Sequence, residues 1–187
     1  MTLGLASSVS LEAAYQRCER ITGEQARNFS YGIRLLPAPK RRSLSAVYAF
    51  ARRVDDIGDS EDPDDVRLAG LAEVREQLHG LQRGTEDPVL VALADTARRT
   101  GLPLSAFDEL IDGCEADVRG TRYDTFEELR GYCRYVAGSI GRLSLAVFGC
   151  DDGTEDRATA TPLADALGVA LQLTNILRDI LEDRRNG

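Results

Sequence analysis

The sequence predicts a single all-α domain over residues 1–187. Apolar residues recur at helical spacing, and the clearest run places Leu44, Val47, Tyr48, Ala51 and Val54 on one helix face. Helix-start signals recur along the chain, and no segment alternates apolar and polar residues between hairpin turns as a strand would. At 187 residues, the chain is long enough to bury a sizeable core.

Start and stop signals place the individual helices. Asp62-Pro63 and Asp87-Pro88 each predict a helix start, because aspartate caps the first amides and proline is tolerated at the first helical position. Gly101 ends the second of these helices, since glycine suits the left-handed turn after a helix. Thr125 and Glu128 predict a capping box. The predicted helices cover about 9–26, 40–57, 62–81, 88–100, a segment after Pro103, 125–148 and 160–184.

Three glycines lie inside the predicted helix 125–148, namely Gly131, Gly138 and Gly141. A glycine in a helix interior costs roughly 1 kcal/mol relative to alanine. Close helix packing, or approach of the backbone to a ligand, would explain why all three are tolerated.

The composition argues against several classes of protein. A net charge of -8 argues against nucleic-acid binding and against simple electrostatic attachment to anionic lipid. No apolar run reaches the roughly 18 residues of a membrane span, and the N-terminus lacks the pattern of a signal peptide. We expect a cytoplasmic protein, and peripheral contact with the inner face of the membrane stays open. The cysteines have no paired spacing and are predicted to be free thiols: Cys18, Cys114, Cys133 and Cys150. The lone His79, among charged residues, is predicted to lie at the surface.

The first acidic motif is 55-DDIGD-59, at the end of a predicted helix. Asp55 and Asp59 are four residues apart, so they share a helix face about 6 Å apart along the axis. Like charges at this spacing destabilise a helix unless a cation lies between them. A single acidic run is more often a solvated helix face than a functional site.

A second acidic ladder strengthens the functional reading. Asn175, Asp179 and Asp183 follow one another at four-residue spacing, with Glu182 beside them. The other face of this helix is apolar and is predicted to pack inward: Leu173, Ile176, Leu177 and Ile180. Oxygen ligands suit Mg²⁺, which commonly bridges to substrate phosphates. Two such ladders on packed helices predict a magnesium and diphosphate site.

Three segments together resemble the squalene/phytoene synthase family. The stretch 29-FSYGIRLLPAPKRRSLSAVYAFARRVDDIGD-59 is similar to its first signature, 132-YCRYVAGSIG-141 to its central helix and 171-LQLTNILRDILED-183 to its second signature. The matches occur in the right order from about residue 28 to the end of the chain. The sequence F-S-Y-G-I-R-L-L-P at residues 29–37 is most similar to that of bacterial presqualene diphosphate or squalene synthases of hopanoid pathways.

The resemblance implies the isoprenoid synthase fold, in which helices surround a central cavity and the two acidic motifs face each other. It assigns the metal to Asp55, Asp59, Asn175, Asp179 and Asp183. Arg52, Arg178 and Asn175 would bind the diphosphate, although an ion pair with Asp55 or Asp56 would also explain Arg52. Tyr48 and Tyr132, with Phe29, would stand near the reacting centre, where aromatic faces can stabilise a cation. Packing in the core would explain these tyrosines equally well.

The implied reaction joins two prenyl diphosphates head to head with the help of Mg²⁺. We expect two molecules of farnesyl diphosphate to give presqualene diphosphate, with NADPH required only if the reaction continues to squalene. Other enzymes of a hopanoid pathway would then be partners. A phytoene synthase using geranylgeranyl diphosphate is the main alternative.

Other readings stay open from the sequence. A head-to-tail elongase or a terpene cyclase would use similar acidic helices, but an elongase would repeat D-D-x-x-D where this chain has Asn175 and Asp179. The chain stops shortly after the second motif, where family members continue with further helices. Residues 26-ARN-28 also differ from the serines or basic residues that many family members have before the aromatic residue. We therefore expect a bundle that is incomplete at its C-terminus, and a fragment or non-catalytic helical partner with little activity is a further alternative.

Overall fold

The computed structural model describes the backbone of residues 9–150 and 154–186. It describes their side chains except at 27–29, 154–156, 181–183, 185 and 186. Two of the side chains predicted for the site, those of Phe29 and Asp183, thus lie outside the described part. Within that part the protein is helical and contains no strand, which confirms the all-α prediction. None of the described helices is both long and apolar enough to cross a bilayer.

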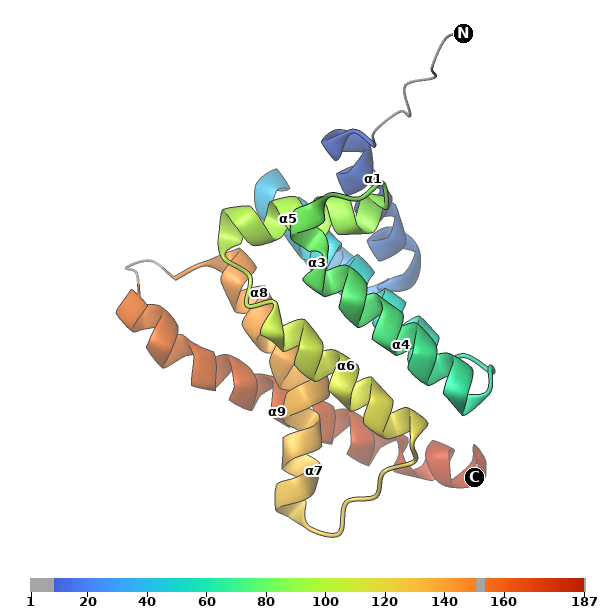
Figure 1. The fold of residues 1–187 in the computed structure, drawn as a ribbon. Coiled ribbons are helices and arrows are strands. Elements are labelled where there is room, and N and C mark those ends of the chain that lie inside the picture. Colours follow the sequence, from blue (N-terminus) through green and yellow to red (C-terminus); the bar gives the residue numbers. More distant parts are fainter. Residues whose placement is uncertain (1–8, 151–153, 187) are drawn as a thin grey trace, which may run out of the picture.

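Nine α-helices and two short helical segments follow one another along the described chain (Figure 1). They are α1 (Leu11–Gln25), α2 (Arg27–Arg34), α3 (Ala38–Gly58), α4 (Asp64–His79), a 3₁₀ turn (Leu81–Arg83), α5 (Pro88–Thr100), α6 (Ser105–Val118), α7 (Phe126–Cys133), the π-helical segment η2 (Arg134–Gly138), α8 (Ser139–Phe148) and α9 (Thr154–Asn186). The short helix α2 was not predicted.

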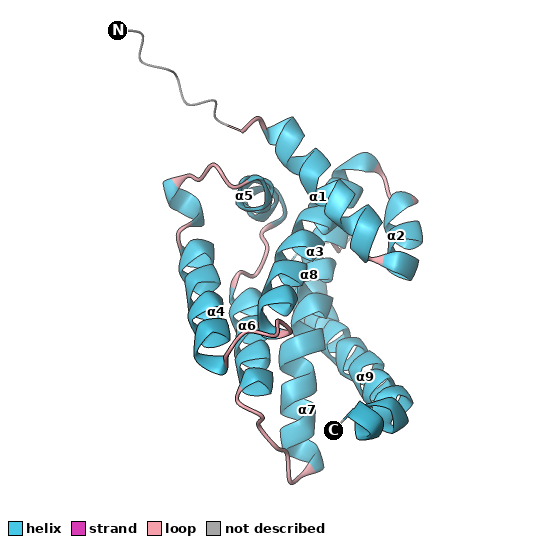
Figure 2. Ribbon diagram, turned by 90° about the vertical axis from the view of Figure 1, so that its right-hand side faces the viewer, coloured by secondary structure: helices cyan, strands magenta, loops and turns pink. Residues whose placement is uncertain are grey.

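Helix α3 lies at the centre of the bundle and packs against α1, α4, α5, α6 and α8 (Figure 2). Its Phe50 is fully buried and meets Phe107 of α6 edge to face, with ring centroids 4.8 Å apart. Edge-to-face pairs are favoured because the positive ring edge meets a negative ring face. Phe50 therefore fixes α3 to the core one to two helical turns before Asp55, the first residue of its acidic end.

Most predicted helix ends are confirmed. Asp87 accepts hydrogen bonds from the amides of Val89 and Leu90, and Gly101 adopts a left-handed φ of 65°. Thr125 and Glu128 form the full capping box. The prediction for Asp62 was wrong: Pro63 occupies the cap position of α4, and the Asp62 carboxylate instead accepts a hydrogen bond from the Ser60 hydroxyl.

The predicted helix 125–148 is interrupted by the π-helical segment η2. Helix α9 approaches this segment so closely that a Cβ on Gly138 would lie 2.8 Å from an oxygen of Asp165. A Cβ on Gly141 would collide with the carbonyl of Ala164. Close packing therefore explains these two glycines as predicted. It does not explain Gly131, which has nothing within 4 Å of its would-be Cβ.

Helix α9 begins at Thr154, earlier than predicted, and continues through Pro162. The prediction that its apolar face packs inward was wrong for Leu177 and Ile180, which are 70% and 52% exposed, whereas Leu173 and Ile176 are half-buried. Small and polar residues, among them Gly168, face the bundle instead, since only a small residue fits against the backbone of Ala137. Among the described side chains of α9, the large apolar residues that are exposed are Leu163, Leu167, Leu171, Leu177 and Ile180.

The described cysteines are all free thiols, as predicted: Cys18, Cys114, Cys133 and Cys150. His79 lies at the surface, as predicted, and its Nε2 is 2.9 Å from Oδ1 of Asp108.

Candidate active site

Residues from five helical segments line a pocket of about 260 Å³ at the acidic end of α3. Helix α3 contributes Asp55 and Asp59, and α7 contributes Tyr132. The remaining lining residues are Gly58 of α3, Leu110, Cys114 and Asp117 of α6, Val136 of η2 and Gln172 of α9. The pocket therefore brings together three of the residues predicted for the site, Asp55, Asp59 and Tyr132.

Asp55 is the most perturbed carboxylate of this pocket. Burial raises its pKa to about 6, the nearby charge of Asp59 adds to the rise, and Arg52 opposes it. The thiol of Cys114 lies 3.8 Å from Oδ1 of Asp55 and donates a weak hydrogen bond to it. Two carboxylates crowded against a buried thiol form a site where a cation would relieve the repulsion.

Tyr132 of α7 also lines this pocket. Its hydroxyl donates a 2.9 Å hydrogen bond to Oδ2 of Asp117, and its ring lies beside that of Tyr123, with centroids 5.1 Å apart. Burial first, and then the charge of Asp117, raises the pKa of the Tyr132 phenol above its ordinary value. The phenol is therefore neutral at physiological pH, with its proton directed at Asp117.

Arg52 points away from this pocket. Its guanidinium forms a 2.6 Å ion pair with Asp56 and lines a second pocket, of about 530 Å³, together with Arg53 and Arg67. Tyr48, one turn before Arg52, is half-buried, and burial raises the pKa of its phenol. Neither Tyr48 nor Arg52 lines the pocket of Asp55 and Asp59.

Helix α9 reaches the pocket through Gln172, which lies three residues before Asn175. Asn175 itself is exposed and Asp179 is half-buried, and neither lines the pocket. Both Nε and Nη2 of Arg178 bind the Asp179 carboxylate at 2.7 Å, which lowers its pKa. In this structure Arg178 therefore neutralises the charge of Asp179. Of the two acidic motifs that were predicted to face each other, the motif on α3 lines the pocket, whereas Asn175 and Asp179 of the motif on α9 do not.

Several lining residues were not among the predicted site residues: Leu110, Cys114, Asp117, Val136 and Gln172. A signal for some of them was present in the sequence. Asp117 lies three residues after Cys114 on the same face of its helix, and Gln172 continues the ladder of Asn175 and Asp179 by one turn.

A family model described as squalene/phytoene synthase matches residues 22–187. The chain belongs to the squalene/phytoene synthase family. Curated relatives named phytoene synthase, from Mycobacterium bovis and Mycobacterium tuberculosis, are each 49% identical over 95% of the chain. The chain spans 57% of the length of these two relatives.

Solved structures confirm the isoprenoid synthase fold for this family member. A dehydrosqualene synthase in complex with a ligand is 35% identical, with a TM-score of 0.82, over 95% of this chain and 60% of that one. The squalene synthase HpnC from Alicyclobacillus acidocaldarius is 37% identical, also with a TM-score of 0.82, over 96% of this chain and 67% of that one.

The donor set of the pocket fits the magnesium ion that this family implies. Asp55 and Asp59 offer carboxylate oxygens from one helix face, and Mg²⁺ is commonly bound by one or two carboxylates together with substrate phosphates. No group of three or more His, Cys, Asp or Glu side chains among the described residues could hold a metal ion alone.

Proposed function

We propose that this protein takes part in the head-to-head condensation of two prenyl diphosphates. The observation that carries the proposal is the convergence of Asp55, Asp59 and Tyr132 on one pocket in a chain of the squalene/phytoene synthase family. The pocket combines acidic groups with an aromatic ring, which suits a substrate with a charged head and a reactive allylic carbon.

Asp55 and Asp59 would hold Mg²⁺ through their carboxylates. When bound, the ion would neutralise the diphosphate and make it a better leaving group. Leu110, Cys114 and Val136 contribute the apolar part of the pocket lining, against which the allylic part of the substrate would pack. The Tyr132 ring would offer its negative face to that cation. On α9, Asn175, Asp179 and Asp183 would complete the metal site, and Arg52 and Arg178 would contact the diphosphate.

The names of the relatives favour geranylgeranyl diphosphate as the substrate and phytoene as the product. Both mycobacterial relatives at 49% identity are named phytoene synthase. The farnesyl reading, with presqualene diphosphate as product, is the second candidate because the two solved relatives are a dehydrosqualene synthase and a squalene synthase. NADPH and partners from a hopanoid pathway belong to this second candidate only. For either candidate we propose a cytoplasmic location with peripheral membrane contact.

The test has a catalytic arm and a binding arm. The protein is incubated with Mg²⁺ and either geranylgeranyl or farnesyl diphosphate, and the lipid products are identified by mass spectrometry. Phytoene from the first substrate is expected. A head-to-head product from farnesyl diphosphate alone would replace the first candidate by the second.

The binding arm uses Mg²⁺ with inorganic diphosphate, followed by thermal unfolding. A ligand that binds only the folded state raises its stability in proportion to RT ln(1 + [L]/Kd). The wild type should be stabilised, and Asp55→Ala and Asp59→Ala should not be. Asp65→Ala, an exposed carboxylate in the first turn of α4, is the matched control. Absence of both product and stabilisation would overturn the proposal and favour a non-catalytic helical partner.

A further inference from the structure

The Tyr132 phenol is fixed from two sides. Its hydroxyl donates to Asp117 at 2.9 Å, and its ring lies against Tyr123 at a tilt of 32°. Asp117 belongs to α6 and Tyr132 to α7, so the hydrogen bond joins two helices that both line the pocket.

The backbone around Asp117 is itself held in place. The carbonyl of Asp117 accepts a 2.9 Å hydrogen bond from the amide of Gly120, and the amide of Thr121 donates to Ala116 at 3.0 Å. Gly120 takes a left-handed φ of 60°, which closes α6 with a tight turn. The carboxylate is therefore presented from a fixed helix end, and the capping box of Thr125 fixes the start of α7 on the other side of the same loop.

This contact determines what the phenol can offer a substrate. A phenol has one proton to donate, and here that proton is committed to a carboxylate. Hydrogen bonds to an ionised acceptor are stronger than those between neutral groups, so the phenol orientation is firmly held. The lone pairs of the phenol oxygen and the face of the ring then remain available to interact with a substrate in the pocket. Both are electron-rich, so they would interact more favourably with an electron-poor carbon than with an anionic diphosphate.

We propose that Asp117 is a positioning residue that orients Tyr132 toward the reacting carbon. The inference rests on the proposed condensation, since it assigns a role within the same pocket. Asp117 acts through the Tyr132 hydroxyl and does not itself contact the substrate.

The first test is kinetic. Asp117→Ala should lower kcat roughly 10- to 100-fold, the range expected when a reacting group is misplaced by about 1 Å, and should change KM little. Asp117→Asn, which keeps an acceptor oxygen, should retain more activity. The double variant of Asp117→Ala with Tyr132→Phe should be no slower than Tyr132→Phe alone, because both changes remove one interaction. Asp124→Ala, an exposed carboxylate of the same loop, is the control.

Additive losses in the double variant, or full activity in Asp117→Ala, would overturn the inference. Loss of stabilisation by Mg²⁺ and inorganic diphosphate in Asp117→Ala would also overturn it, since that result would make Asp117 part of the metal site.

A second test is independent of turnover. The six tyrosines are labelled with ¹³C at Cζ, and the Tyr132 signal is assigned by its loss in Tyr132→Phe. Asp117→Ala should move the Tyr132 signal selectively. If the wild type makes no product, the proposed condensation fails, and a selective shift still establishes that Asp117 orients the phenol. An unmoved signal would refute the positioning role whatever the outcome of the activity assay.

Discussion

The amide of Asp59 donates a 2.8 Å hydrogen bond to the carbonyl of Asp55, so the two residues lie one helical turn apart at the end of α3. Both side chains line the same pocket, and the charge of Asp59 contributes to the raised pKa of Asp55. This arrangement costs stability in the absence of a bound cation.

Asp55→Asn should stabilise the metal-free protein at neutral pH. The pKa of Asp55 is about 6 in the folded state, above its ordinary value, so the folded state holds this proton more tightly than the unfolded chain does. The free energy of unfolding therefore falls as pH rises from about 4 to about 6 and is constant above that window. After allowance for partial exposure, the gain at pH 7.5 should be about 1–2 kcal/mol, or about 3–6 °C in Tm.

The measurement is thermal unfolding in EDTA at pH 7.5 and at pH 4.5. The wild type and Asp55→Asn should differ at the higher pH and converge at the lower, where Asp55 is protonated. Asp124→Asn provides an exposed control. An equal difference at both pH values would mean that the gain arises from packing and not from the charge.

The pocket could be predicted from the sequence only on its α3 and α7 sides. Asp55 and Asp59 were found because helical spacing alone places them together. Asp117 and Gln172 were not assigned, because helical spacing relates them only to neighbours on their own helices, and their place in the pocket depends on how α6 and α9 cross α3 and α7. Arg52 was predicted to bind the diphosphate, but its guanidinium is paired with Asp56 in this structure. Whether the side chain contacts Asp56 or a ligand depends on its rotamer, which sequence spacing does not determine.

Helix existence was predicted well, because caps and apolar periodicity are local. The interruption at η2 was not predicted, since it accompanies contact with α9, a helix distant in sequence. The orientation of α9 was predicted wrongly for Leu177 and Ile180 for a related reason. Its apolar residues form a face, but Gly168 and Asp165 on the other face fit the backbone and the arginines of η2 and α8.

Gly168→Ala should separate α9 from η2. The added Cβ would lie 2.5 Å from the carbonyl oxygen of Ala137 and 2.7 Å from the amide nitrogen of Gly138, and backbone atoms cannot rotate away. Overpacking of this kind typically costs about 1–3 kcal/mol. Gly131→Ala, with nothing within 4 Å, should instead gain about 0.5–1 kcal/mol. Urea denaturation measures both, and equal signs for the two variants would contradict the close approach of α9 to η2.

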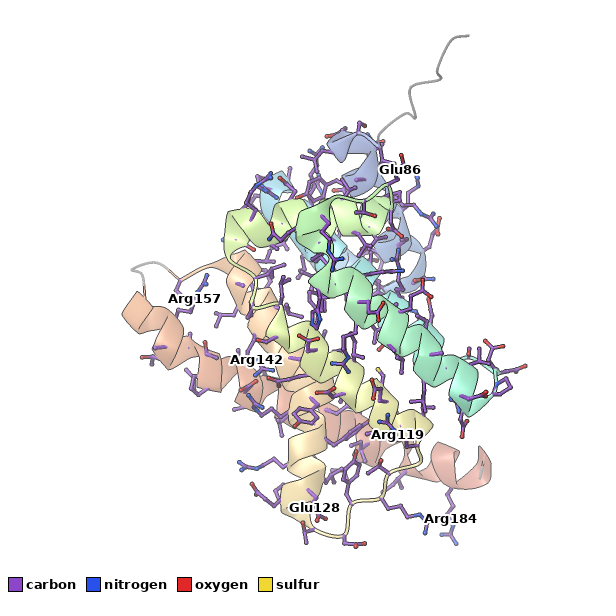
Figure 3. The ribbon with its side chains drawn as sticks, in the orientation of Figure 1. Glu86, Arg119, Glu128, Arg142, Arg157 and Arg184 are labelled. Atoms are coloured by element: carbon purple, nitrogen blue, oxygen red, sulfur yellow. The ribbon has the colours of Figure 1, made fainter. Side chains whose placement is uncertain are left out.

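Arg142 should be the most sensitive charge in the bundle outside the pocket. It is 9% exposed and lies where α6, α8 and α9 meet (Figure 3), 2.5 Å from Glu109 and 3.3 Å from Asp165. Removing one partner of a buried network leaves uncompensated charge, so Arg142→Ala should cost about 3 kcal/mol. Arg130→Ala breaks an exposed pair with Glu127 and should cost less than about 1 kcal/mol. Similar losses of unfolding free energy would show that Arg142 is solvated.

Arg52 tests whether a guanidinium that is paired with Asp56 also contacts a bound diphosphate. Its guanidinium is paired with Asp56, yet it is near enough to Asp55 to oppose the rise in the pKa of that carboxyl. If Arg52 turns to a bound diphosphate, Arg52→Gln should weaken binding of Mg²⁺ and inorganic diphosphate roughly 10-fold, the loss of one charge-assisted contact. Asp56→Asn removes the competing partner and should leave binding unchanged or tighter. Calorimetric titration measures both dissociation constants, and equal weakening by the two variants would mean that the intact ion pair, and not a free Arg52, supports the site.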